Sequence, residues 1–209
     1  MQEIYLDFIP EDEFLPEGIW RIYIESVGSN EEQDLSDELP TLDDVNMRES
    51  RVDMWIPVSE TLSSQTGFLR SSPESTLTIP STSVGVITVG AFDQRFDQPA
   101  PFSGRGYTWA TNQIKPDIVA PGVEILSASP GGSYTRRTGT SMAAPFATGA
   151  SALFLEWGIV LNNDNYLYGE KVKAYFIKGA RRLPGLQYYP NPQVGYGALC
   201  IENSLPGYV

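Results

Sequence analysis

The first third of the chain alternates apolar and polar positions in the manner of β-strands. Gly18–Val27 carries β-branched and aromatic residues on both alternating sets of positions, which predicts a strand. Arg51–Val58 is a second candidate strand, and Thr76–Ile79 is a short third one. Residues 28–49 lie between the first two and are rich in Glu, Asp and Ser, so we expect a long solvated loop there.

The remainder of the chain has the pattern of an α/β domain. Gly85–Phe92 is a compact apolar run, and Ile114–Ala120 ends in another just before a Pro-Gly pair. Each predicts a buried strand. Longer segments from Ser141 to about Leu161 and over Gly169–Leu183 predict two helices. A short segment, Tyr196–Leu205, ends this part of the sequence.

Charge divides the chain into the same two parts. Residues 1–80 contain 18 acidic and four basic side chains, whereas residues 81–209 contain eight and ten. This shift predicts two modules, 1–80 and 81–209, with a boundary near Pro80. The formal net charge of the whole chain is −12. We therefore expect no nucleic-acid partner, because phosphate binding needs clustered Lys and Arg.

Composition removes several kinds of chemistry. The chain has no histidine and a single cysteine, Cys200, so it supplies no imidazole base, no His-ligated metal site and no internal disulfide. Residues 138–155 form an uncharged run of membrane-span length. Its many Thr, Ser, Ala and Gly residues, with Pro145 inside the run, favour a packed interior helix and no membrane span. The acidic start of the sequence predicts no signal peptide.

Gly139 to Pro145, with the sequence Gly-Thr-Ser-Met-Ala-Ala-Pro, is the sharpest signal for chemistry. A serine in the first turn of a helix lies beside free backbone N–H groups, which stabilise an oxyanion together with the helix dipole. Gly139 would allow a close approach of neighbouring backbone. The plain alternative, that Ser141 or Thr140 is only a helix N-cap, stays open on this pattern alone.

Several motifs in a fixed order resemble those of the subtilisin-like serine peptidases, the subtilase family. They are the serine motif followed by Gly149, and upstream of it Lys115–Gly122, Ile87–Asp93 and Phe102–Gly106. The segments beginning at Gly18, Met54 and Thr76 resemble the later part of a jelly-roll insertion in clostridial subtilases of the Csp type. The tail of the chain resembles the same group at Glu156–Val160, Leu167–Lys173, Gly179–Arg182 and Tyr189–Cys200.

The resemblance implies an α/β fold and assigns roles to three residues. Residues 81–209 would be the C-terminal part of a subtilisin-like parallel-sheet domain, and residues 1–80 part of an inserted β jelly-roll. Ser141 would be the nucleophile and its N–H an oxyanion donor, with Thr140 and Gly139 at the oxyanion and substrate-binding site. The substrate would be a protein or peptide. No cofactor is expected. Calcium is common in the family, but no ligand is assigned here. Relatives with this insertion act around spores or outside the cell.

The chain departs from the family pattern in its triad. A subtilase triad runs Asp, His, Ser along the chain, and the Asp and His motifs are absent here. We therefore expect the C-terminal part of a longer protease, inert or nearly so without its N-terminal part. A Ser–Lys dyad would be the internal rescue, with four candidates: Lys115, Lys171, Lys173 and Lys178. Two other interpretations stay open: a non-catalytic pseudoprotease or binding module, and one chain of a two-chain protease.

Overall fold

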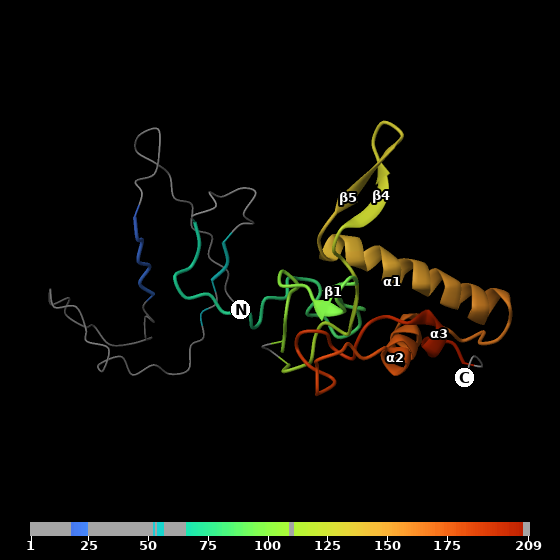
Figure 1. The fold of residues 1–209 in the computed structure, drawn as a ribbon. Coiled ribbons are helices and arrows are strands. Elements are labelled where there is room, and N and C mark those ends of the chain that lie inside the picture. Colours follow the sequence, from blue (N-terminus) through green and yellow to red (C-terminus); the bar gives the residue numbers. More distant parts are fainter. Residues whose placement is uncertain (1–17, 25–51, 53, 57–65, 109–110, 207–209) are drawn as a thin grey trace. The chain divides into compact units, whose positions relative to one another are not determined.

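The computed structural model describes residues 18–24, 52, 54–56, 66–108 and 111–206. The chain divides into two compact units, Met1–Thr66 and Gly67–Val209. Every helix and strand of the described residues lies in the second unit (Figure 1). The expected division into 1–80 and 81–209 as two domains stays a prediction, as does the jelly-roll assignment of residues 1–80.

The described residues of the first unit form no strand. Gly18–Ile24, the described part of the first expected strand, is irregular, and its apolar side chains are exposed on both alternating sets of positions. A strand is stable only where a neighbouring strand pairs with its backbone, and these residues belong to no sheet of the described part of the chain. The strand predictions are therefore wrong for residues 18–24, 52 and 54–56. The rest of both segments, and the expected loop at 28–49, lie outside the described residues.

Thr76–Ile79 is not a strand either, and it belongs to the second unit. The N–H of Thr76 donates to the carbonyl of Arg105 at 2.9 Å. The N–H of Arg105 in turn donates to the Thr76 hydroxyl at 2.9 Å. These two hydrogen bonds join Thr76 to Arg105, 29 residues further along the chain. They hold the segment against the loop at 104–106 without forming a strand.

A parallel pair of strands forms the centre of the second unit. β1 (Val89–Asp93) and β3 (Ile118–Pro121) run side by side, with Val89 opposite Ile118 and Phe92 opposite Pro121. β2 (Gln98–Pro99) pairs antiparallel with only the last two residues of β1. The buried strands expected within Gly85–Phe92 and Ile114–Ala120 are confirmed, each shorter than its apolar run.

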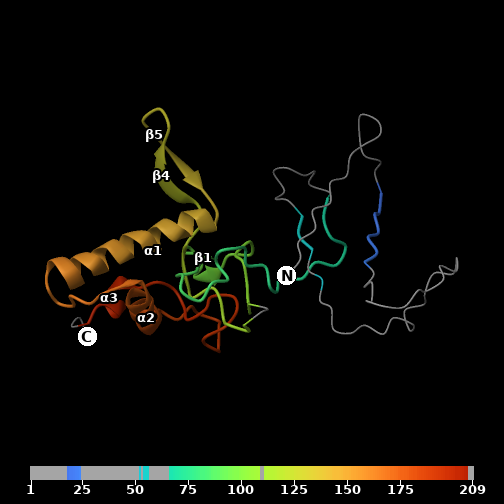
Figure 2. The ribbon, with the colours of Figure 1, turned by 180° about the vertical axis from the view of Figure 1, so that it is seen from behind.

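A second, two-stranded sheet precedes the serine motif. β4 (Ile125–Ser129) and β5 (Ser133–Arg137) form an antiparallel hairpin. Its turn contains two glycines with positive φ, Gly131 at 83° and Gly132 at 75°, a conformation that glycine adopts without steric cost. Figures 1 and 2 show this hairpin beside the end of α1 where that helix begins. Arg136 and Arg137, shortly before the serine motif, thus lie in a strand.

Helices cover one face of the parallel pair. α1 (Thr140–Leu155) continues into a π-helical turn, η1 (Glu156–Val160), and is followed by α2 (Gly169–Gly179) and the short α3 (Ile201–Ser204). The expected helix from Ser141 to about Leu161 is confirmed, and the second expected helix ends four residues early. α1 and α2 meet through Phe154 and Phe176, whose rings lie edge to face with centroids 5.2 Å apart. These two side chains belong to a buried core with Ile118, Ala147, Ala150, Leu167 and Val172.

The continuous helix Thr140–Val160 has a length and composition that would suffice to cross a membrane. In the second unit it instead buries Ala143, Ala147, Ala150 and Phe154 within the fold. Core helices of globular domains often pass such a test of length and hydropathy. The expectation of no membrane span stays a prediction.

Candidate active site

α1 begins at the carboxyl ends of the two parallel strands. The N–H of Gly122, just after β3, donates to the carbonyl of Phe92 at 3.1 Å, and the N–H of Gly139 donates to the carbonyl of Gly122 at 2.8 Å. A Cβ atom on Gly122 would lie 2.6 Å from the Cβ of Ala91, so only glycine fits between the strand and the helix start. Ligand sites of parallel α/β sheets lie at this end of the strands.

The start of α1 settles the N-cap alternative. Gly139 is the N-cap residue, with φ 156° and ψ 163°, and no side chain caps the helix. Its carbonyl accepts a hydrogen bond from the N–H of Met142 at 3.0 Å. Thr140 and Ser141 are therefore the first two residues of the helix itself. Neither side chain is used as a cap, and the interpretation of Ser141 or Thr140 as a structural N-cap is wrong.

Ser141 combines exposure with an electrostatically favourable position. Its side chain is exposed, and no residue in the described part of the chain hydrogen-bonds to its hydroxyl. The first N–H groups of a helix have no partner in the preceding turn, and the helix dipole adds partial positive charge there. A hydroxyl at this position can attack a carbonyl beside donors for the oxyanion, once a base removes its proton.

Thr140 and Gly139 lie beside Ser141, as the resemblance implies. Both are half-buried. The N–H of Gly139 is already bonded to Gly122, so Gly139 acts here by fixing the backbone path. The N–H groups of Thr140 and Ser141 are the ones in the first turn that lack such a bond. The roles assigned to these three residues stay predictions.

The candidate lysines are engaged elsewhere or lie on another surface. Lys115 and Lys173 both bind Asp117, with Nζ–carboxylate distances of 2.8 Å to its two oxygens. Asp117 precedes β3, so this cluster lies at the amino end of the strand, whereas α1 starts at its carboxyl end. Lys171 forms an ion pair with Asp164, and Lys178 is exposed on α2. The structure gives a Ser–Lys dyad no support.

The cluster around Asp117 is buried and tightly bonded. Lys115 is 1% exposed and also donates to the carbonyl of Val86 and the hydroxyl of Thr88, each at 3.1 Å. Asp117 accepts from the N–H of Thr88 at 2.7 Å. Burial lowers the pKa of the Lys115 ammonium, and its bond to Asp117 opposes that shift. Lys173 is half-buried. Lys-Pro-Asp directly before a strand was the signal for this cluster.

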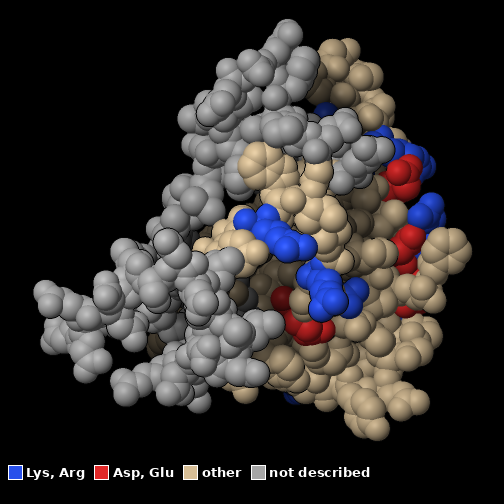
Figure 3. Space-filling view, turned by 90° about the vertical axis from the view of Figure 1, so that its left-hand side faces the viewer, with Lys and Arg blue, Asp and Glu red and all other residues tan. Residues whose placement is uncertain are grey.

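Lys171 has a pKa shifted in the opposite direction from that of Lys115. Its side chain and that of Asp164 meet near the surface. The hydrogen bond to Asp164 raises the pKa of Lys171, and the same bond lowers the pKa of Asp164. On the face shown in Figure 3, Lys and Arg side chains likewise lie next to Asp and Glu side chains. Two further ion pairs join Arg95 with Asp93 and Arg181 with Asp97, each at 2.7 Å.

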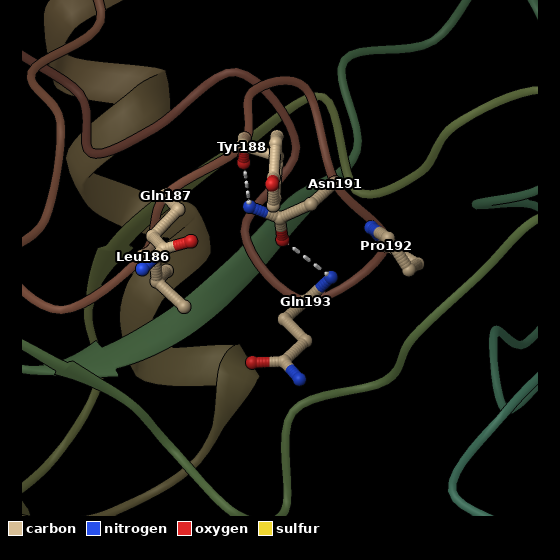
Figure 4. A pocket seen from close by; sticks show the side chains of 6 residues that line it. All are labelled: Leu186, Gln187, Tyr188, Asn191, Pro192 and Gln193. Carbon is tan, nitrogen blue, oxygen red and sulfur yellow. Dashed lines mark hydrogen bonds between the residues drawn. The ribbon is translucent and has the colours of Figure 1, made fainter.

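A small pocket in the C-terminal loop is separate from the serine. Asn191 shapes it: its amide donates to the carbonyl of Tyr188 at 2.8 Å, and its side-chain oxygen accepts from the N–H of Gln193 at 3.0 Å (Figure 4). None of the side chains around it is charged, so it offers no acid, base or nucleophile. It is lined by Leu186, Gln187, Tyr188, Asn191, Pro192 and Gln193.

Acidic side chains do not cluster in the described part of the chain. No three acidic, histidine or cysteine side chains gather there closely enough to hold a metal ion. The carboxylates that are buried, such as Asp117, bind lysines instead. The calcium that is common in the family stays without assigned ligands in this chain.

The exposed Ser141 thus lies at the start of a helix, at the carboxyl ends of two parallel strands of an α/β fold. The family model of the subtilases, Peptidase S8, matches residues 17–197. The chain therefore belongs to the subtilase family. The α/β fold described above is that of the subtilisin-like domain.

Individual relatives agree with this assignment. Serine protease AprX of Bacillus subtilis is 36% identical over 159 residues, which are 66% of this chain and 34% of AprX. Mouse membrane-bound transcription factor site-1 protease is 33% identical over 129 residues, 59% of this chain and 12% of that protein. The chain thus spans about a third or less of the length of these relatives.

Solved structures resemble about two thirds of this chain. The CspB protease of Clostridium perfringens superposes with a TM-score of 0.64 and 47% sequence identity, covering 66% of this chain and 29% of that chain. The prenylagaramide maturation protease PagA superposes with a TM-score of 0.52 and 28% identity, covering 63% and 46%. The jelly-roll insertion is not shown by these comparisons.

Proposed function

We propose that this chain supplies the nucleophile part of a subtilisin-like serine endopeptidase. The observation that carries this proposal is the position of Ser141 in the first turn of α1. Its side chain is exposed, and its hydroxyl has no hydrogen bond among the described residues. Gly139, and not Ser141, is the N-cap residue of the helix. A serine with no structural task at a helix start is suited to acyl transfer. The substrate class is a protein or peptide.

The reaction follows from that geometry. The Ser141 oxygen attacks the peptide carbonyl, its proton passes to a base, and the carbonyl oxygen gains negative charge beside the N–H groups of the first helical turn. The C–N bond then breaks, the leaving amine takes the proton, and water hydrolyses the acyl-enzyme. The chain has no histidine, so the base comes from a polypeptide part that bears the triad Asp and His. Loss of a triad member costs about 10⁴–10⁶ in kcat.

Reconstitution tests this proposal. The chain is purified alone and mixed with the segment of Clostridium perfringens CspB protease that precedes the aligned part. Casein hydrolysis and covalent labelling of Ser141 by a fluorophosphonate are measured. We expect background rates for the chain alone and a rise of at least about 10³-fold for the mixture. Ser141→Ala abolishes both signals, whereas Ser127→Ala, an exposed serine in β4, keeps them.

The alternative functions predict different hydrolysis and labelling results in the same experiment. A pseudoprotease or binding module gives no hydrolysis and no labelling in any mixture, and Ser141→Ala then changes nothing. A two-chain protease gives activity with a separately encoded partner. Hydrolysis that survives Ser141→Ala would contradict the proposed nucleophile outright.

A further inference from the structure

Two arginines lie close to the candidate nucleophile. Arg136 and Arg137 are the last two residues of β5, and both are exposed. Arg137 precedes Ser141 by four residues, which corresponds to at most about 14 Å even for a fully extended chain. An extended peptide advances about 3.3 Å per residue. A peptide bond held at Ser141 therefore brings the flanking peptide residues within range of the long Arg137 side chain.

The two arginines differ in what their side chains contact. Arg136 donates from Nη1 to the carbonyl of Glu124 at 2.8 Å. Successive side chains of a strand point to opposite faces, so Arg137 is on the other face of β5, where Ile125 is its cross-strand neighbour. No residue in the described part of the chain hydrogen-bonds or forms an ion pair with the Arg137 guanidinium. This guanidinium is therefore free to bind a carboxylate that another molecule supplies.

The backbone between Arg137 and Ser141 is held in place by hydrogen bonds. The N–H of Glu124 donates to the hydroxyl of Thr138 at 3.0 Å. The N–H of Gly139 donates to the carbonyl of Gly122 at 2.8 Å. These bonds fix the end of β5 against the start of α1, so the position of the arginine relative to the serine is set by the fold before any substrate binds.

The charge around the serine is opposite in sign to that of the whole chain. The chain carries a net charge of −12. Between Pro121 and Leu155, however, the sequence contains Arg136, Arg137 and a single acidic residue, Glu124. The first turn of α1 has no acidic side chain, and the start of a helix adds partial positive charge. The segment that bears the nucleophile is therefore suited to an anionic group.

We propose that Arg137 makes the protease select peptides that carry an acidic side chain within two positions of the bond that Ser141 attacks. The proposal rests on the proposed function and names the substrate class of that same site. The guanidinium binds the carboxylate through paired N–H···O hydrogen bonds, whereas a basic side chain at the same position is repelled. Arg137 determines specificity in this way and takes no part in proton transfer.

A carboxylate of the Asp- and His-bearing part of the protease is the rival partner for Arg137. In that case the charge of the arginine is neutralised within the assembled enzyme, and the choice of peptide does not depend on it. The position of Arg137 favours the substrate, because its side chain is exposed and only four residues from the serine.

Peptide hydrolysis by the reconstituted protease tests this selection. The chain is mixed with the segment of Clostridium perfringens CspB protease that precedes the aligned part. The ratio kcat/KM is measured for otherwise identical neutral peptides that carry one Glu, Gln or Lys at either of two positions on each side of the cleaved bond. We expect Glu to be favoured over Lys by at least about fivefold at one of these positions, with Gln between them.

Substitutions of the arginines assign this preference to one side chain. Arg137→Gln should reduce it to less than about twofold, and Arg137→Glu should reverse it. Arg136→Gln is the matched control, because it removes the same charge from the next residue of the strand but on the opposite face, and should leave the preference unchanged. Circular dichroism checks that every variant keeps its fold. The preference should weaken at high salt, which screens exposed charges.

A second measurement detects the charge near the serine position without any hydrolysis. In a Cys200→Ala background, Ser141→Cys gives the chain a single thiol at the nucleophile position. Its reaction rates with dithionitrobenzoate, which carries two carboxylates, and with uncharged dithiodipyridine are compared. A change in the thiol pKa alters both rates alike, so their ratio reports the local positive charge. Adding Arg137→Gln should lower this ratio at least about twofold at low salt, and adding Arg136→Gln should lower it less.

An active mixture without a Glu preference at any position would overturn the inference, and is the result expected if the missing part of the protease neutralises Arg137. A preference that Arg137→Gln leaves unchanged, or that both arginine variants reduce equally, would also overturn it. An inactive mixture contradicts the proposed function instead. The thiol measurement then decides the inference alone: a ratio that Arg137→Gln lowers supports an anion-selecting role, and an unchanged ratio overturns that role.

Discussion

Ser141 and Gly139 divide two tasks at the start of α1. A φ of 156° at Gly139 is a conformation that side-chain-bearing residues rarely adopt. The glycine therefore turns the chain into the helix, and the serine hydroxyl is released from capping. The motif predicts from the sequence that Ser141 lies in the first turn of a helix. The hydrogen bond between Gly139 and Gly122 could not be predicted, because only the fold brings these two positions together.

Lys115 shows the same limit for charged groups. Its partners Thr88 and Val86 lie 27 and 29 residues away, and the sequence spacing gives no sign of burial. A lysine that is 1% exposed pays a desolvation penalty that favours its neutral form. The free energy of unfolding should therefore change with pH as the Lys115 ammonium titrates.

We predict that the free energy of unfolding rises with pH as Lys115 titrates. Its folded pKa is lowered below the ordinary value of 10.5, so between the two values the unfolded chain binds more protons than the folded one. The penalty is complete below the folded pKa and disappears as pH rises towards 10.5. Urea denaturation at pH 8 and pH 10 measures the rise.

The control for this titration is Lys115→Met, which should remove that rise. Lys171 has a raised pKa, so its stabilising contribution is lost only as pH rises above 10.5 and stays constant in this window. An equal pH difference in the parent chain and in Lys115→Met would exclude Lys115 as its source.

At the scale of elements, long apolar patterns were predictable and short pairings were not. α1 has sixteen residues and a dense apolar stripe, so its existence follows from the sequence. The hairpin β4–β5 has exposed or half-buried positions throughout and mixes apolar with polar residues, so its pattern does not predict strands. Gly18–Ile24 has the pattern of a strand but belongs to no sheet of the described residues, which shows that pattern alone does not make a strand.

Helix packing gives the element-scale prediction. A Cβ atom on Gly179, the last residue of α2, would overlap the backbone of Ser204 in α3. We expect Gly179→Ala to destabilise the chain by about 1–3 kcal/mol, as overpacking does. Gly149 lies within α1 and has no atom within 4 Å of its Cβ position. Gly149→Ala should therefore stabilise the chain by about 0.5–1 kcal/mol through helix propensity. Thermal denaturation compares the two, and equal shifts would contradict the close approach of α2 and α3.

At the scale of the whole molecule, charge and contacts place the boundary between the two parts at different residues. The charge shift favours Pro80, whereas the compact units meet between Thr66 and Gly67. The segment between those positions contains Thr76, whose two hydrogen bonds to Arg105 tie it to the second unit. Charge composition is summed over a segment and is insensitive to such single contacts, so it places a boundary only coarsely.

Two fragments decide between these boundaries. Fragment 67–209 keeps both bonds between Thr76 and Arg105, and fragment 81–209 loses them. Since each hydrogen bond contributes about 0.5–1.5 kcal/mol, we expect the longer fragment to be more stable by about 1–3 kcal/mol in urea denaturation. Within the longer fragment, Thr76→Val removes the hydroxyl that accepts from the N–H of Arg105 and donates to the carbonyl of Pro73, so it should cost about 1–3 kcal/mol. If both fragments unfold at the same urea concentration, residues 67–80 add nothing to the second unit, and the boundary lies at Pro80 as the charge pattern predicts.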